Sequence, residues 1–222
     1  VTNIVNIIRQ TELQSDEVNI IVAFNEENNL LVKKLGRDFG IGRIPLKEEP
    51  HKKFTFCTST AFAGCDFYST CASTFVISDN KKVCTSIDIA TELAQIAGRQ
   101  RLECNPFRNT TTFIYNVDVG ESKEDSYKSA LNAKWQKSVK NANYKNSVTD
   151  KDLKEDFIKE TVDSQKLNKY SKSYVWYDEI NQRFSVNRMA YLNDCFSYDV
   201  QKENYLDGIT VRKQLEDSGF NV

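Results

Sequence analysis

Residues 18–24, Val18-Asn19-Ile20-Ile21-Val22-Ala23-Phe24, are the stretch of this chain that most restricts its fold. The run is nearly continuous in apolar, mostly β-branched residues, which is typical of a strand buried on both faces of a parallel sheet. Asn25 follows at a position suited to cap a helix, and leucines then recur at helical spacing until Gly36. The stretch predicts a strand followed by a helix, which is the repeating unit of an α/β domain.

Three further short apolar runs predict strands at 54–58, 74–78 and 112–117. A helix is expected between the last two, and the capping-box-like pair Thr85 and Asp88 marks its start. Strands that alternate with helices indicate right-handed βαβ units and a parallel sheet with flanking helices. We therefore expect an α/β domain over residues 1–120.

The pattern changes character near Gly120. Helical spacing is expected from Glu121 to about Ala142 and again after a cap at Thr149. A linker rich in Lys, Ser and Asn follows, and then two short strands near 174–186 resemble a β-hairpin. A helix capped by Asn187 and a last helix from about Thr210 to Asp217 complete the chain. Residues 121–222 are thus predicted to be an α-rich extension with one hairpin.

Composition excludes several classes of function. The chain has 222 residues, 40% of them apolar and 27% charged, with a formal net charge of −1. No apolar stretch reaches the roughly 18 residues of a membrane span, so we expect no membrane partner. Near-neutrality means that nucleic acid can be bound only through local basic patches. We expect a cytoplasmic location.

The cysteines and the single histidine argue against metal and triad chemistry. The six cysteines form no C-x-x-C pair, and His51 lies in a polar loop. Structural zinc sites need paired ligands at short spacing, and nucleophilic triads need a histidine near the nucleophile. We therefore expect no metal site, and reduced, mostly buried thiols.

Two motifs carry chemistry. The first is TSTAFAGCDF, residues 58–67, directly after a predicted strand, and the second is QIAGRQR, residues 95–101, at the end of a helix. A guanidinium keeps its proton and matches phosphate oxygens with a planar fork of N–H donors. Phosphoryl transfer needs such positive charge near the γ-phosphate. An arginine held by one domain and inserted into the nucleotide site of another makes hydrolysis depend on domain closure.

Together these segments resemble motifs V and VI of superfamily 2 helicases, and Asn19 to Asn25 resembles motif IV. The similarity covers about residues 18–118 and implies a RecA-like helicase C-terminal domain. The form Gln-x-x-Gly-Arg-x-Arg most resembles viral, phage and plasmid replication helicases of the origin-binding type. By this resemblance Asn25 and Thr58 bind nucleic acid, and Gly64, Asp66 and Gly98 lie at the ATP cleft. Gln95, Arg99 and Arg101 would face the phosphates as the catalytic residues.

One departure concerns the second arginine. In the commoner motif it stands three residues after the first, and Leu102 occupies that position here. Arg101 then fills the role or leaves it vacant, and Arg108 is a weaker outside candidate. Which of Arg99 and Arg101 is the finger stays open. Gly98 is expected to permit close backbone approach, and Thr58 to offer a hydroxyl to a phosphate oxygen.

The sequence contains no G-x-x-x-x-G-K-[ST] and no acidic metal-binding box after a strand. The resemblance therefore implies that ATP with magnesium is bound mainly by an N-terminal RecA-like domain of the same polypeptide, and that this chain alone is inactive. The other expected partner is DNA or RNA, in single-stranded form. One alternative is a non-catalytic RecA-like interaction or regulatory module of a replication complex, and another is a standalone nucleic-acid-binding domain with no motor partner.

The extension offers one further pattern. Between Ser126 and Thr149 there are five lysines and no acidic residue. Lys134, Lys137 and Lys140 are expected on one helical face with aromatic residues nearby, which suits single-stranded nucleic acid. Such a pattern is more often a solvated lysine face, with Trp135 packed against the first domain.

Overall fold

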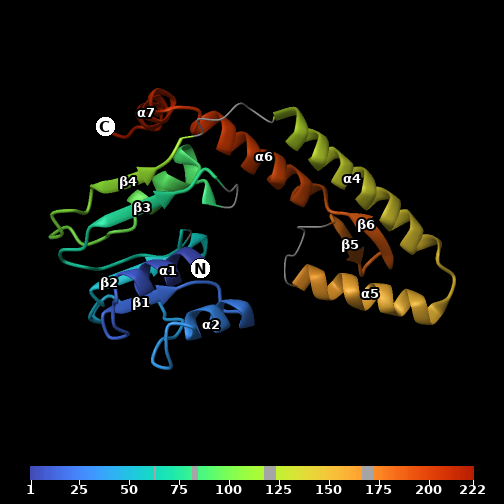
Figure 1. Cartoon of the computed structure of the whole chain (residues 1–222), viewed down its shortest axis with the longest axis horizontal. Coiled ribbons are helices and arrows are strands. Elements are labelled where there is room, and N and C mark those ends of the chain that lie inside the picture. The colour runs from blue at the N-terminus through green and yellow to red at the C-terminus, as the bar shows by residue number, and fades with distance from the viewer. Residues whose placement is uncertain (63, 82–84, 118–123, 167–172) are drawn as a thin grey trace. The chain divides into compact units, whose positions relative to one another are not determined.

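Figure 1 shows the computed structural model of the chain, which describes residues 1–62, 64–81, 85–117, 124–166 and 173–222. The fold is mixed α/β, with seven α-helices, two small sheets of parallel strands and one antiparallel strand pair among the described residues. The chain forms two compact units. The first comprises 1–79, 87–116 and 212–222, and the second comprises 80–86 and 117–211.

The elements of the first unit are α1 (Thr2–Gln10), β1 (Val18–Ile21), α2 (Glu26–Lys33), β2 (Phe54–Cys57), the short turn η1 (Ser59–Ala61), β3 (Thr74–Ser78), a wide helical turn (Ile89–Leu93) that continues as α3 (Ala94–Ala97), and β4 (Thr111–Tyr115). Those of the second unit are α4 (Glu124–Ser147), α5 (Lys151–Lys166), β5 (Val175–Asp178), β6 (Arg183–Val186) and α6 (Arg188–Asn204). The last helix, α7 (Gly208–Asp217), begins in the second unit and ends in the first.

Strand β1 is buried on both faces, as its sequence predicts. Val18 and Ile20 pack with Ile4 and Ile8 of α1 and with Val32 of α2. The opposite face of β1 carries Ile21, which packs against Ala61 and Cys65 of the segment after β2. Successive side chains of a strand point to opposite faces, so a single strand anchors two layers. Helix α1, which the sequence analysis did not assign, supplies part of one layer.

The expected strand does not reach Phe24. Strand β1 ends at Ile21, and the side chain of Phe24 is 86% exposed. The chain turns here because Asn25 takes extended geometry and caps α2, with its Oδ1 accepting a hydrogen bond of 2.8 Å from the amide of Asn28. The cap prediction is confirmed, and the prediction of a buried Phe24 is wrong.

The strands of the first unit pair in parallel, but they do not form one sheet. β1 pairs with β2, and β3 pairs with β4 in the register Val76 to Phe113. Within the described residues these remain two separate two-stranded sheets. After β2 the chain folds back onto Ile21 through Ala61 and Cys65 and does not continue as a neighbouring strand. An isolated parallel bridge between Phe67 and Gln100 lies outside both sheets.

The second unit has its own core. β5 and β6 pair antiparallel, with Val175 opposite Val186, within the region assigned from the sequence to a hairpin. Val175 and Phe184 pack with Ala142 of α4, and Phe157 and Ile158 of α5 border the cluster. Long helices therefore cover a short two-stranded sheet.

Helix starts differ from expectation in two places. Asp150 Oδ1, rather than Thr149, accepts the capping hydrogen bond from the amide of Leu153. The helix of the first unit begins at Ile89 after Asp88, not at Thr85. Asn187 caps α6 by accepting from the amide of Ala190, as predicted. The expected boundary near Gly120 and most of the expected linker, residues 167–172, lie outside the described residues.

Candidate functional site

The two motif segments of the first unit meet through backbone hydrogen bonds. The amide of Phe67 donates to the carbonyl of Arg99 over 2.9 Å, and the amide of Arg101 donates to the carbonyl of Phe67, also over 2.9 Å. These bonds form the parallel bridge between Phe67 and Gln100. Because they fix the backbones in register, Asp66 is held beside Arg99 and Arg101.

One carboxylate lies between two guanidinium groups. Asp66 Oδ1 accepts a hydrogen bond of 2.8 Å from Arg101 Nε and lies 3.6 Å from Arg99 Nη1. Two positive groups and one negative group leave the cluster with one surplus positive charge. Such a cluster attracts anions, and the planar forks of arginine match phosphate or carboxylate oxygens.

Arg99 is the more enclosed of the two arginines. Its side chain is 19% exposed, whereas that of Arg101 is 47% exposed. Its Nε is buried and has no hydrogen-bond partner in the part of the chain that the structure describes, and neither has the buried Oε1 of Gln100. A guanidinium carries five N–H donors, more than Asp66 satisfies here. Arg99 thus has N–H donors that Asp66 does not satisfy.

The first motif is positioned by β2 and by the second face of β1. The amide of Thr58 donates to the carbonyl of Ile21 over 3.3 Å, and the carbonyl of Thr58 accepts from the amide of Ala61 over 2.9 Å. Burial, reinforced by Cys65, raises the pKa of the Cys57 thiol to about 12. Cys57 therefore stays protonated at neutral pH and serves as a core residue next to Thr58.

The second motif follows a helix anchored by apolar side chains. Ile89 and Leu93 are almost fully buried, and the amides of Glu92 and Leu93 both donate to the carbonyl of Asp88. After this wide first turn the helix continues as α3, on which Gln95 faces solvent. The helix delivers the backbone of Arg99 to the bridge with Phe67, while Gln95 makes no part of the arginine cluster.

The two predicted cleft glycines differ in conformation. Gly64 has φ of +86°, in the left-handed region that favours glycine. Gly98 has φ of −83°, and a Cβ placed there would lie 3.9 Å from the carbonyl oxygen of Gln95, an ordinary contact. The fold itself therefore favours glycine at position 64, whereas at position 98 the folded chain would accept a side chain without backbone strain.

Two predicted nucleic-acid residues follow neighbouring parallel strands. Thr58 comes directly after β2, and Asn25 lies four residues beyond the end of β1. The side chain of Asn25 is used as the α2 cap. Phe24, which the sequence did not single out, is exposed just beyond the end of β1. The residue at the staple position of α2 is Asn29, which is polar, so the cap gives Phe24 no apolar partner. The sequence signal for an exposed Phe24 was an apolar residue directly before a capping Asn.

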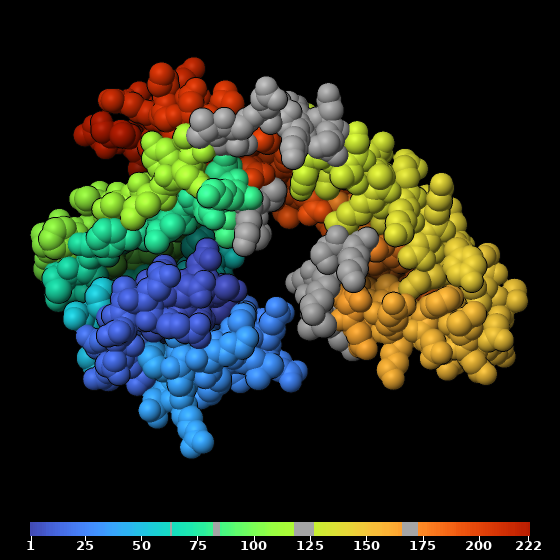
Figure 2. Space-filling model, viewed as in Figure 1, coloured from blue at the N-terminus to red at the C-terminus, as the bar shows by residue number. Residues whose placement is uncertain are grey.

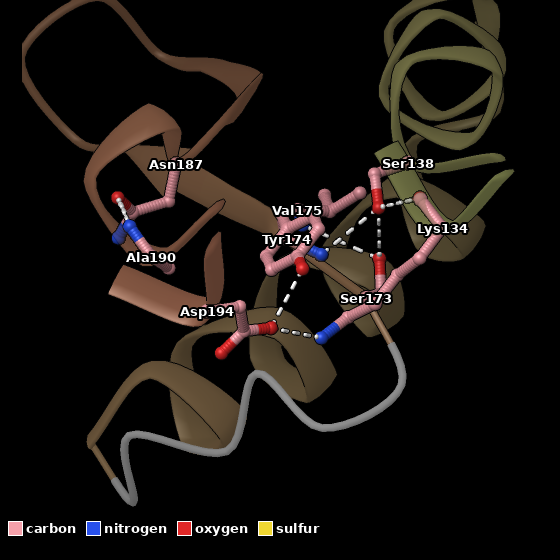
Figure 3. Close-up of polar contacts among 8 residues, drawn as sticks. All are labelled: Lys134, Ser138, Ser173, Tyr174, Val175, Asn187, Ala190 and Asp194. Atoms are coloured by element: carbon pink, nitrogen blue, oxygen red, sulfur yellow. Dashed lines mark hydrogen bonds and ion pairs between the residues drawn. The ribbon is translucent and has the colours of Figure 1, made fainter. Parts of the chain in front are cut away.

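The three predicted lysines of α4, in the second unit, do not share one surface. Lys134 is turned inward, with its ammonium 2.9 Å from Asp194 Oδ2 and 3.9 Å from the centre of the Tyr174 ring (Figure 3). Lys137 and Lys140 are exposed. Trp135 packs against Tyr174 and Tyr191 of its own unit.

A polar network surrounds Tyr174 (Figure 3). Its hydroxyl donates to Asp194 Oδ2 over 2.6 Å, and its amide donates to Ser138 Oγ over 2.9 Å. Ser138 Oγ in turn donates to the carbonyl of Lys134 over 2.8 Å. Burial and the Asp194 carboxylate raise the pKa of Tyr174 far above its ordinary value. The network is inside the unit and joins α4, β5 and α6.

Among the described residues, no group of three or more His, Cys, Asp or Glu side chains is arranged to hold a metal ion. No described helix is both long enough and apolar enough to cross a membrane. No protein-family model, no curated protein and no solved structure matches this chain. The arginine cluster with Asp66 is the candidate site that its geometry supports best.

Proposed function

We propose that this chain contains the second RecA-like motor domain of a superfamily 2 helicase or translocase driven by ATP hydrolysis. The observation that carries the proposal is the bridge between Phe67 and Gln100. This bridge holds Asp66 of one motif against Arg99 and Arg101 of the other. Phe67 and Gln100 lie 33 positions apart in sequence, and phosphate chemistry explains why two arginines would be brought to one place.

In this proposal the arginines act on a nucleotide held mainly by an N-terminal RecA-like domain of the same polypeptide. ATP with magnesium supplies the triphosphate whose γ-phosphoryl group is transferred to water. Arg99 and Arg101 donate N–H groups to phosphate oxygens and stabilise negative charge in the transition state. Asp66 acts as a positioning residue, because its carboxylate aligns both guanidinium groups.

The nucleic-acid contacts are proposed at the carboxyl ends of β1 and β2. Thr58 offers a hydroxyl to the phosphate backbone, which carries no sequence information. Phe24, 86% exposed at the neighbouring strand end, offers an aromatic face on which a base can stack. Asn25 would contribute through its backbone, since its side chain caps α2.

The test uses the intact polypeptide that contains this chain together with the proposed nucleotide-binding N-terminal domain. Arg99→Ala and Arg101→Ala are compared with Arg212→Ala, a control that removes an exposed arginine paired with Glu216. Removing a finger arginine is expected to lower kcat for nucleic-acid-stimulated ATP hydrolysis by about 10³- to 10⁵-fold. The control should retain wild-type kcat, and the variant with the larger loss identifies the finger.

Two results would overturn the proposal. One is substantial ATP hydrolysis by the present chain alone, and the other is unchanged kcat in both arginine variants of the intact protein. If hydrolysis is unchanged but assembly with replication proteins is lost, the non-catalytic interaction module is the better description.

A further inference from the structure

The outward side of α4 has an uneven distribution of charge. Its exposed residues between 128 and 147 are lysine, alanine, asparagine, glutamine, serine and one tyrosine, with no Asp or Glu among them. In Figure 2 this helix lies at the surface of the second unit, in yellow-green. The chain as a whole holds 31 acidic and 30 basic residues, so a helix side without carboxylates is a local separation of charge.

Helical geometry gathers three of these residues. At 100° per residue, Lys137, Lys140 and Tyr144 fall within an arc of about 60° and span roughly 10 Å along the axis. Ala133 lies on the same arc, one turn before Lys137. We call Ala133, Lys137, Lys140 and Tyr144 the α4 strip. All four are exposed, and the Tyr144 side chain is 59% exposed.

The lysines on the inner side of α4, by contrast, have partners within the second unit. Lys134 is paired with Asp194, and Lys145 lies 3.3 Å from Glu160 Oε2 and 3.0 Å from Thr161 Oγ1. Lys137 and Lys140 form no ion pair with the residues that the structure describes. The inner lysines therefore fasten the helix to its unit, and the strip lysines are available to an external anion.

The strip has the chemistry of a site for single-stranded nucleic acid. Lysines neutralise phosphates, and an exposed aromatic ring stacks on a base. A membrane surface would require large apolar side chains beside the lysines, and this strip offers alanine and one tyrosine. Helix α5, by contrast, interleaves acidic residues with its lysines, including Asp152, Glu155 and Asp156.

We propose that the α4 strip binds single-stranded DNA or RNA, with Lys137 and Lys140 on phosphates and Tyr144 stacked on a base. This surface belongs to the second unit and requires no nucleotide. It is therefore a nucleic-acid contact separate from the arginine cluster and from Thr58, and it stands whether or not the first unit is a motor.

The test is fluorescence anisotropy of a labelled 20-nucleotide oligothymidylate with the whole chain between 50 and 200 mM salt. The variant Lys137→Gln/Lys140→Gln is expected to bind about tenfold more weakly at 50 mM salt. The slope of log K against log salt should fall by about 1.4, because each single-strand phosphate contact contributes about 0.7. Tyr144→Ala should weaken binding about tenfold with an unchanged slope, and Tyr144→Phe should retain wild-type affinity.

The matched control is Lys151→Gln/Lys159→Gln, which removes two exposed lysines from α5. It should bind like wild type. The proposal is overturned if wild-type chain does not bind, if the strip variants bind like wild type, if the control loses as much affinity, or if a duplex of equal length binds more tightly. A Thr58→Val variant separates the two proposals. If Thr58→Val loses binding while the strip variants bind like wild type, the oligonucleotide is bound by the first unit and not by the α4 strip.

Discussion

Asp66 contributes to the candidate site through position rather than through stability. Its pair with Arg101 is partly exposed, and such surface pairs contribute roughly 0–1 kcal/mol to folding. The carboxylate nevertheless holds two guanidinium groups that would otherwise repel each other. At this scale the sequence predicted which residues belong to the site. It did not predict that Arg99 and Arg101 both lie against one oxygen of Asp66.

Gly64 and Gly98 provide a matched pair of substitutions. Gly64→Ala should lower the free energy of unfolding by about 1–2 kcal/mol, because an L-residue is strained at φ of +86°. Gly98→Ala should leave it unchanged or raise it by up to about 1 kcal/mol, since φ is −83° and the added Cβ has space.

Urea unfolding of both glycine variants checks these values. Equal destabilisation by the two substitutions would contradict the described backbone. If Gly98→Ala folds normally yet abolishes ATP hydrolysis in the intact protein, a ligand or another domain must approach Gly98 closely.

At the scale of elements, the Tyr174 network joins α4, β5 and α6. Tyr174→Phe removes a hydrogen bond to the charged Asp194, and such bonds contribute about 1.5–3 kcal/mol. We expect a loss of that size at pH 7, measured by urea unfolding. Tyr144→Phe, which changes an exposed tyrosine, should cost almost nothing.

The same pair of variants tests a dependence on pH. The pKa of Tyr174 is raised in the folded chain, so above about pH 10 the unfolded state loses its phenol proton while the folded state keeps it. The stability of wild type relative to Tyr174→Phe should therefore be full below pH 10 and should decline above it. A constant difference up to pH 11 would contradict the buried, hydrogen-bonded hydroxyl.

At the scale of the whole molecule, each unit has its own core. Ala142, Val175 and Phe184 form a cluster within the second unit, while Ile8, Ile20 and Val32 belong to a cluster of the first. A fragment of residues 117–211 should therefore unfold cooperatively by circular dichroism. Tyr174→Phe should destabilise the fragment by the same free energy as the whole chain, since distant sites act additively.

A gradual, non-cooperative transition of the fragment would contradict independent folding. The control is the fragment carrying Phe184→Ala, which removes a buried side chain and should cost about 3–5 kcal/mol.

The sequence by itself determined what depends on near neighbours along the chain. A β-branched run made β1 a buried strand, and Asn25 and Asn187 were recognisable helix caps because a cap needs only the next three residues. The residue types of the two motifs were also visible without coordinates.

Tertiary structure alone decided which distant side chains share a place. Asp66 meets Arg101 across 35 positions, and Lys134 meets Asp194 across 60, so that a lysine expected on the surface is internal. Phe24 became exposed because the cap of α2 turned the chain out of its strand. Spacing along a helix or strand follows from local geometry, whereas these contacts depend on how separate elements pack, which no local pattern specifies.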